Sequence, residues 1–320
     1  MRLDPVNVEI LNNHYGAITN EMGYIIWRTA FTAYVKETWD FAQGLATVDG
    51  ELFAFSKDIG GAPFLGLPLG DVISSTWFEE GDILICNDPY TAPGVCTHLP
   101  DLHLVKPLFH DGRLVCFMWN FIHAADVGGI TPGSAPPSTF DIHQEGVRIP
   151  PSKLFKKGIV DEEIKAFVLA NTRVPHDVWG DVKALVAALN MGERRMRELI
   201  GRFGLEMIED GIADVLEYGE MRARAILGEI PNGSYSFVDY IEGYPGDGMP
   251  SRIELTLTVS GTDVMMDFTG TDLQMASSYN IPTHGRLNHF LTFGLVTYIR
   301  SRDAGCPLNS GIVRPISVKV

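Results

Sequence analysis

The chain has 320 residues, 45% of them hydrophobic, and is long enough to bury two ordinary cores or one large one. Its formal net charge of −15 argues against nucleic acid and anionic membrane surfaces as partners, because both require basic patches. The four cysteines lack a metal-type CxxC spacing, and neither a signal peptide nor an apolar run of transmembrane length is visible, so we expect a cytoplasmic protein.

The first predicted element is an amphipathic helix at the start of the chain. Asp4 can cap it, Pro5 fits the first helical position, and apolar residues recur at spacings of three and four between Val8 and Ile25. This stripe predicts a helix that packs its apolar side against the core.

Two hairpins are predicted downstream of this helix, each around an Asp-Gly pair, which favours a tight turn between antiparallel strands. The first pairs residues 45–48 with 52–55, and the second pairs residues 102–108 with 114–121. The second hairpin lies within the most histidine-rich part of the chain.

A loop and two helices are predicted next. Residues 131–151 are rich in Pro, Gly and Ser, and a loop of this length inside a compact domain is usually functional or disordered. Asp161 can cap a following helix, and a longer apolar repeat runs from Val178 to Phe203, with Gly204 as a natural stop.

Strand patterns return in the C-terminal part. Residues 253–259 alternate apolar and polar side chains, and a turn at 260–263 leads into a second strand at 264–268. Residues 311–320 form an apolar, β-type run that reaches Val320 without a turn signal. We therefore expect an unfinished sheet and a chain that is a fragment of a longer subunit.

These blocks of strands and helices predict an α+β fold in three regions. Residues 1–155 form a mixed, strand-rich region that carries a metal site, residues 156–230 form a helical region, and residues 231–320 form a β-rich region that we expect to be incomplete.

The metal site is predicted from the stretch between Asn87 and Glu145, which holds five of the nine histidines among carboxylates. Three motifs in it read as turns of one polar site: THLPD at 97–101, HAADVGG at 123–129 and DIHQEG at 141–146. Imidazole nitrogens and carboxylate oxygens suit a borderline divalent metal such as zinc, iron or manganese. This stretch therefore predicts the metal-bearing part of an enzyme.

The predicted ligands are five side chains: Asp40, His98, Asp101, His123 and His143. A short turn through Pro100 can point His98 and Asp101 at one ion, and His123 ends an apolar strand, where side chains are presented to a cleft. Taken singly, each histidine is more often an ordinary surface or core residue, so the prediction depends on the cluster.

Further carboxylates fall near these motifs. Asp88, Asp126 and Glu145 could orient the imidazoles from a second shell, and Asp126 is also the main rival as a fifth ligand. Asp40 lies between the apolar Trp39 and Phe41, where a buried carboxylate needs a cationic partner.

The same motifs, together with DPY at 88–90, QEGVRIPP at 144–151, WDF at 39–41 and DFTGTD at 267–272, resemble the hydantoinase B/oxoprolinase family. That family is related to the large subunits of ATP-dependent ketone carboxylases. The resemblance covers nearly the whole chain in the same order, with two departures. The family often has two adjacent histidines where this chain has His123-Ala124, and its members continue beyond the last residue of this chain.

The resemblance implies a metal-containing B-type subunit of an ATP-dependent enzyme that opens a cyclic amide such as a hydantoin, a lactam or a 5-oxoproline-like ring. It also implies a hetero-oligomer in which ATP is bound by a hydantoinase A-like ATPase subunit, which phosphorylates the substrate. The chain itself has no GxxxxGK[ST] motif, and GYPGDG at 243–248 is better explained as a turn than as a phosphate-binding loop.

Other functions are compatible with the same sequence. The chain could be the corresponding subunit of an ATP-dependent ketone carboxylase, or a non-catalytic structural partner subunit. Ala124 and the missing C-terminal part lend some support to the structural function. Cys96, close to His98, could act as a thiol nucleophile, although cysteine is more often a small buried apolar residue.

Overall fold

A computed structural model describes residues 1–61, 64–133, 136, 138–242 and 249–320, so the turn predicted at 243–248 lies outside the described residues. Strands and helices alternate in blocks, and the predicted α+β class is confirmed. The helices are α1 (Pro5–Thr29), α2 (Ala33–Lys36), α3 (Leu69–Ser74), α4 (Glu162–Ala170), α5 (Pro175–Phe203), α6 (Leu205–Leu227) and α7 (His289–Arg302), with the 3-10 turns η1 (Ile142–Gln144) and η2 (Ser310–Val313). The strands are β1 (Phe41–Ala46), β2 (Leu52–Phe55), β3 (Ile83–Cys86), β4 (Asp101–His110), β5 (Arg113–His123), β6 (Ser152–Lys156), β7 (Ile159–Val160), β8 (Gly233–Ile241), β9 (Ser251–Ser260), β10 (Asp263–Asp267) and β11 (Ile316–Lys319).

The larger sheet has seven strands in the order β2-β1-β5-β4-β3-β6-β7, and all its neighbours are antiparallel. Both predicted hairpins are present in it, as β1–β2 and β4–β5. The turn between β4 and β5 uses Asp111 and Gly112, whose φ angles of 50° and 76° lie in the left-handed region that such turns require. The β4–β5 hairpin forms the centre of the sheet.

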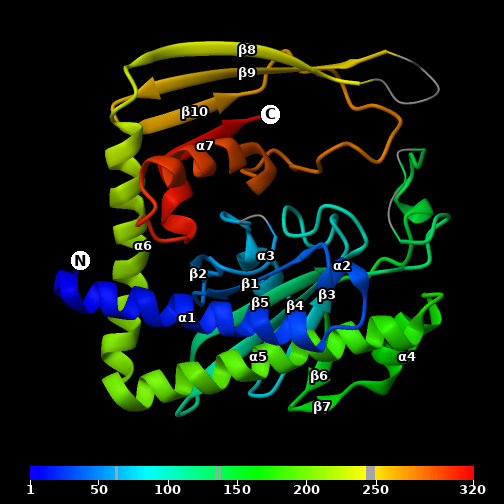
Figure 1. Ribbon diagram of the computed structural model, residues 1–320. Helices are drawn as coiled ribbons and strands as arrows, with labels where there is room; N and C mark the ends of the chain where they lie inside the picture. Colours follow the sequence, from blue (N-terminus) through cyan, green and yellow to red (C-terminus); the bar gives the residue numbers. More distant parts are fainter. Residues whose placement is uncertain (62–63, 134–135, 137, 243–248) are drawn as a thin grey trace.

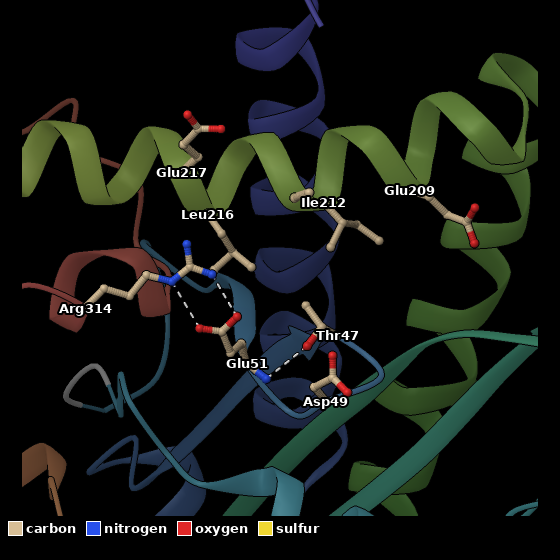
Figure 2. Close-up of a pocket in the computed structure, with 9 residues that line it drawn as sticks. Thr47, Asp49, Glu51, Glu209, Ile212, Leu216, Glu217 and Arg314 are labelled. Atoms are coloured by element: carbon tan, nitrogen blue, oxygen red, sulfur yellow. Dashed lines mark hydrogen bonds and ion pairs between the residues drawn. The ribbon is translucent and has the colours of Figure 1, made fainter. Parts of the chain in front are cut away.

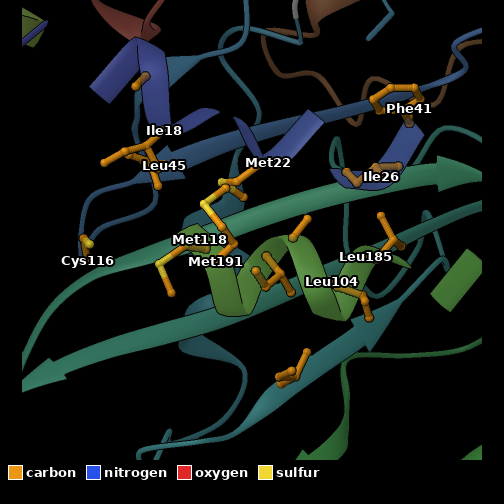
Figure 3. Close-up of a cluster of buried hydrophobic side chains, with 14 of the residues drawn as sticks. Ile18, Met22, Ile26, Phe41, Leu45, Leu104, Cys116, Met118, Leu185 and Met191 are labelled. Carbon is orange, nitrogen blue, oxygen red and sulfur yellow. The ribbon is translucent and has the colours of Figure 1, made fainter. Parts of the chain in front are cut away.

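Two long helices, α1 and α5, cover one face of this sheet (Figure 1). Asp4 caps α1 by accepting hydrogen bonds from the backbone N–H groups of Val6 and Asn7, as predicted. Asp161 caps α4 in the same way, and α5 ends where Gly204 adopts a φ of 83°, which also confirms the predicted stop. Figure 3 shows the core between the helices and the sheet, which includes Met22 of α1 and Met118 of β5.

A second core lies on the opposite face of the same sheet. In β5, Cys116, Met118 and Ile122 belong to the helix-covered core, whereas Phe117, Trp119 and Phe121 belong to the second. Side chains alternate between the faces of a strand, so β5 is buried on both sides and is almost entirely apolar. The second core also includes residues of α7, β9, β10 and η2.

The smaller sheet has the order β11-β10-β9-β8, and the predicted hairpin between residues 253–259 and 264–268 forms its centre. Helix α6 leads from the layer of α1 and α5 to this sheet (Figure 1). The β-type run predicted over 311–320 is a strand only over Ile316–Lys319, where it pairs in parallel with β10. Its first part is the 3-10 turn η2 instead, because the Asn309 side chain accepts a hydrogen bond from the Gly311 backbone N–H and caps that turn.

Among the residues that the structure describes, none of the helices combines the length and apolarity needed to cross a bilayer.

Candidate metal centre

Three neighbouring strands of the larger sheet, β1, β5 and β4, have polar side chains at the same end of the sheet. Asp101 is the first residue of β4 and pairs with His123, the last residue of β5. Asp40 immediately precedes β1, and its backbone carbonyl accepts a hydrogen bond of 2.9 Å from the His123 backbone N–H. His98 lies in the turn that leads into β4. The sheet register therefore brings together four side chains that are up to 83 positions apart in the sequence.

The donor atoms of this group converge on Asp101. Its Oδ1 lies 2.9 Å from Nε2 of His98 and 3.6 Å from Nδ1 of His123. Potential ligand atoms of these three residues all lie within 4.8 Å of one another, and no other such group of His, Cys, Asp and Glu is found in the described part of the chain. Asp40 is at the margin of the group, with Oδ2 3.7 Å from Nδ1 of His123.

The second nitrogen of His123 is fixed by the backbone. Its Nε2 lies 3.0 Å from the Gly133 carbonyl oxygen, which can only accept, so Nε2 carries the proton and donates. In the neutral ring this leaves the lone pair of Nδ1 facing Asp101. Metal-binding histidines characteristically use their second nitrogen in this way, because the hydrogen bond sets both the tautomer and the ring orientation.

The charges of the group are strongly coupled. Burial alone would raise the pKa of Asp101, but the adjacent imidazoles of His98 and His123 outweigh it and hold this pKa well below its usual range. Burial would lower the pKa of His98, yet the charge of Asp101 and the hydrogen bond to it raise this pKa to about 9. A buried carboxylate held between two imidazoles is a donor set that suits a divalent cation.

Asp40 reaches the group through an unusual backbone geometry. Trp39 has a φ of 59°, which is uncommon for a bulky residue. Strained backbone of this kind persists where the surrounding structure enforces it, often at functional sites. The Asp40 side chain is 47% exposed, compared with 8% for Asp101, so Asp40 lies on the open side of the group.

The group opens into a cavity of about 750 Å³. Its lining also includes Tyr34, the aromatic residues Phe64, Phe121 and Phe290, and the segment 278–282, which precedes α7. None of these residues is part of the predicted site. The segment 278–282 is more than 150 positions from His123, and Phe121 has the pattern of an ordinary core residue, so the sequence contains no local signal for either.

The fifth predicted ligand lies elsewhere. His143 is exposed in η1, where its backbone N–H donates to the Asp141 side chain, and it does not line the cavity. Its role as a ligand stays a prediction.

The three predicted second-shell carboxylates have different surroundings. Glu145 accepts a long hydrogen bond of 3.4 Å from the Leu99 backbone N–H, beside His98. Asp88 pairs with Arg148 at 2.8 Å, and Asp126 pairs with Arg173 at 2.6 Å. Of these carboxylates, Glu145 is the one placed to influence His98, and it raises the pKa of that imidazole.

Two buried residues near the group are held in uncharged forms. His103 lies on β4, as predicted, where its Nδ1 accepts a hydrogen bond from Trp119 and its ring stacks on Phe121 with 5.1 Å between centroids. Burial lowers the pKa of His103 to about 4. Cys96 is completely buried, and burial raises the pKa of its thiol well above the usual value, which argues against a thiol nucleophile.

A second cavity, of about 420 Å³, lies between α6 and the turn that joins β1 to β2 (Figure 2). Its lining is acidic, and its described lining includes neither histidine nor cysteine. Arg314, its one lining cation among the described residues, is paired with Glu51 at 2.8 Å and with Glu220 at 3.4 Å. This cavity therefore offers a weaker ligand set than the first.

Comparisons with known proteins agree with the motifs. The profile of the hydantoinase B/oxoprolinase family matches residues 4–320. The chain is 27% identical over 332 residues to the putative B-type subunit of a D-/L-hydantoinase from Pseudomonas sp. (strain NS671), covering 99% of this chain and 56% of that protein. It is 30% identical over 331 residues to the 5-oxoprolinase of Dictyostelium discoideum, covering 98% of this chain and 25% of that protein.

A solved structure shares the fold. The crystal structure of the ATP-dependent caprolactamase from Pseudomonas jessenii superposes with a TM-score of 0.85 at 24% identity, covering all of this chain and 54% of that one. Identity at this level is evidence for the fold alone. The chain spans between about a quarter and a little over half the length of these three proteins.

Proposed function

The chain belongs to the hydantoinase B/oxoprolinase family, and from that premise we propose that it is the metal-containing B-type subunit of an ATP-dependent cyclic amide hydrolase. The substrate is a hydantoin, a lactam or a 5-oxoproline-like ring. The observation that carries this proposal is the convergence of His98, Asp101 and His123 at the wall of a cavity large enough for such a ring.

In this proposal His98, Asp101 and His123 hold one zinc, iron or manganese ion, with Asp40 as a further carboxylate on the open side. Two imidazoles and one carboxylate are a common donor set for these metals. A bound divalent ion would supply Lewis acidity to a carbonyl oxygen or to a water molecule.

The protein side chains have separate tasks around this ion. The hydrogen bond from His123 to Gly133 keeps the imidazole oriented, and Asp101 keeps both histidines turned toward one point. Phe121 and Phe290 offer an apolar surface for the carbon atoms of the ring and exclude water from that side. The hydroxyl of Tyr34, whose ring centroid lies 5.0 Å from that of His123, is a donor for a carbonyl oxygen.

ATP use is assigned to a second subunit. The sequence has no GxxxxGK[ST] motif, and a relative is named as the B-type component of a hydantoinase. We therefore assign ATP binding and phosphorylation of the substrate to a hydantoinase A-like partner, and completion of ring opening to this chain.

Co-purification with an A-type partner, followed by assay with ATP and a panel of hydantoins and lactams, tests the proposal. Ring opening coupled to ADP formation is expected for the native complex. It should be lost in His98→Ala and retained in His176→Ala, a matched control because the His176 side chain is 84% exposed outside the cavity. Bicarbonate-dependent carboxylation of a ketone without ring opening would instead identify a carboxylase subunit. A complex with neither activity would favour a structural role.

A further inference from the structure

The cavity beside the metal centre has an apolar wall, and its composition bears on which rings the cavity can accept. Phe64, Phe121, Ile281 and Phe290 form its apolar part. Phe64 packs against Phe121 with 4.7 Å between ring centroids and against Phe290 with 6.2 Å, so the three rings form one continuous surface. This surface comes from three distant parts of the chain.

The segment that carries Ile281 is anchored to the loops of the larger sheet. The Ser278 hydroxyl donates to the Pro136 carbonyl at 2.9 Å, and Nε2 of His284 donates to the Pro89 carbonyl at 3.0 Å. These two contacts lie on either side of Ile281 in the sequence. They hold the segment 278–282 against these loops.

Most polar groups of the lining already have partners. The amide nitrogen of Asn280 donates to the carbonyls of Met275 and Ser277, and its oxygen accepts from the Met275 N–H. The Thr97 hydroxyl donates to Asp101 at 3.2 Å. The lining hydroxyls without a partner of this kind, among the described residues, are those of Tyr34 and Tyr279, which are uncharged.

No lysine or arginine is among the described residues that line this cavity. The residues that the structure does not describe include neither type. The lining carries two carboxylates, Asp40 and Asp101, together with the imidazoles of His98 and His123. When the amide of the ring faces His98, Asp101 and His123, a carboxylate on the far side of the ring would lie against the apolar wall, where no lysine or arginine can pair with it. Rejection by a buried site is strong when a charged group loses its hydration without gaining partners.

We infer that this cavity selects an uncharged ring, such as a simple lactam or an unsubstituted hydantoin, and rejects a ring that bears a carboxylate. The inference rests on the proposed function and narrows its substrate class. Ile281 is the lining position at which a single substitution should change this preference. It lies at the rim and is 44% exposed, so a longer side chain fits there without disturbing the core.

A matched pair of probes tests this inference: 2-pyrrolidinone and 5-oxoproline, which share one ring and differ by a carboxylate. Saturation-transfer NMR titrations of the full chain should give a dissociation constant at least about tenfold lower for 2-pyrrolidinone. Ile281→Arg adds a cation at the rim and should reverse or abolish this preference. Ile281→Gln, of similar length but uncharged, should keep it.

Equal or tighter binding of 5-oxoproline to the native chain would overturn the inference, and so would the absence of binding by both probes. Unchanged preference in Ile281→Arg would overturn the role of Ile281. The metal content of the same samples separates these results from a failure of the proposed function. A metal-loaded chain that prefers 5-oxoproline contradicts the selection of uncharged rings and leaves the metal-containing hydrolase subunit intact.

Discussion

Asp101 and His123 lie directly opposite each other across β4 and β5, and a β-bulge is responsible for this pairing. At the turn, His110 pairs with Arg113, and Phe109 pairs with Leu114. From Leu108 and Cys116 onward the register has gained one residue, which leaves Val115 unpaired. Without this shift, Asp101 would pair with Ile122, and His123 would point to the other face of the sheet.

Deletion of Val115 should remove the bulge and still leave Asp101 opposite His123. The shortened strand would pair with β4 as a simple two-residue hairpin, in which the residues from Cys116 to His123 keep their partners from Leu108 to Asp101. Metal content of the folded fraction, measured by elemental analysis after size-exclusion chromatography, should therefore stay close to the native value. Val115→Ala keeps the register and should keep the metal, at a cost of about 1–3 kcal/mol in the free energy of unfolding. Loss of the metal from a folded deletion variant would contradict the strand pairing described above.

Asp82 should make stability dependent on pH. Its buried carboxylate accepts hydrogen bonds from Lys153 at 2.8 Å and from the backbone N–H groups of Glu79 and Lys157, both at 2.9 Å. Burial alone would raise the pKa of Asp82, but these partners outweigh it and lower the pKa. A lowered pKa gives stability that is fully present above the unfolded value of about 3.9 and is lost as the pH falls through the folded value.

Asp82→Asn should accordingly lower the free energy of unfolding by about 1–3 kcal/mol at pH 7, as measured by urea denaturation. The difference from the native chain should shrink below about pH 4, because the native carboxylate is then becoming protonated. Asp111→Asn is the matched control, since the Asp111 side chain is 94% exposed, and it should change stability by less than about 0.5 kcal/mol. A decrease in the free energy of unfolding for Asp82→Asn that is equally large at pH 7 and pH 3 would contradict this account.

A helical glycine should be essential for the packing of α6. A Cβ atom at Gly219 would lie 2.3 Å from Oδ1 of Asn309. Asn309 cannot move easily, because it is buried and its amide donates to the Val215 carbonyl and accepts from the Gly311 N–H. Gly219→Ala should cost about 1–3 kcal/mol in thermal or urea unfolding. Gly201→Ala, in α5 with no atom within 4 Å, should be neutral or stabilising, and equal effects of both would refute the packing argument.

The isolated chain should not bind ATP. Its sequence lacks a phosphate-binding loop, and its net charge is −15. Calorimetric titration with ATP and Mg²⁺ should show no saturable heat, while saturable, near-stoichiometric binding would reveal a nucleotide site and remove the need for a separate ATPase subunit.

Local features of the fold could be predicted from the sequence because they depend on neighbouring residues. Asp4 before Pro5 specifies the start of α1, and the Asp111-Gly112 pair specifies the β4–β5 turn. The bulge at Val115 could not be predicted, since an apolar strand has the same composition in either register. The cavity wall at residues 278–282 could not be predicted either, because only long-range packing brings it to the histidines.

The candidate site, too, could be predicted from the sequence only in part. His98, Asp101 and His123 converge in the structure as the short motifs predict, whereas His143 belongs to an equally polar motif and lies exposed in η1. Spacing within a motif does not determine which way a loop side chain points. The direction of His123, in contrast, is set by its place at the end of a paired strand.

The most direct test of the metal centre is the metal content of the chain purified without added metal, measured by elemental analysis. The native chain should contain about one zinc, iron or manganese ion per molecule. The double variant His98→Ala, Asp101→Ala should contain almost none. The control variant His176→Ala, Asp177→Ala removes an exposed ion pair with a similar distance, 3.1 Å between Nδ1 and Oδ1, and should match the metal content of the native chain. Native metal content in the His98→Ala, Asp101→Ala variant would contradict the assignment of this group as the metal centre.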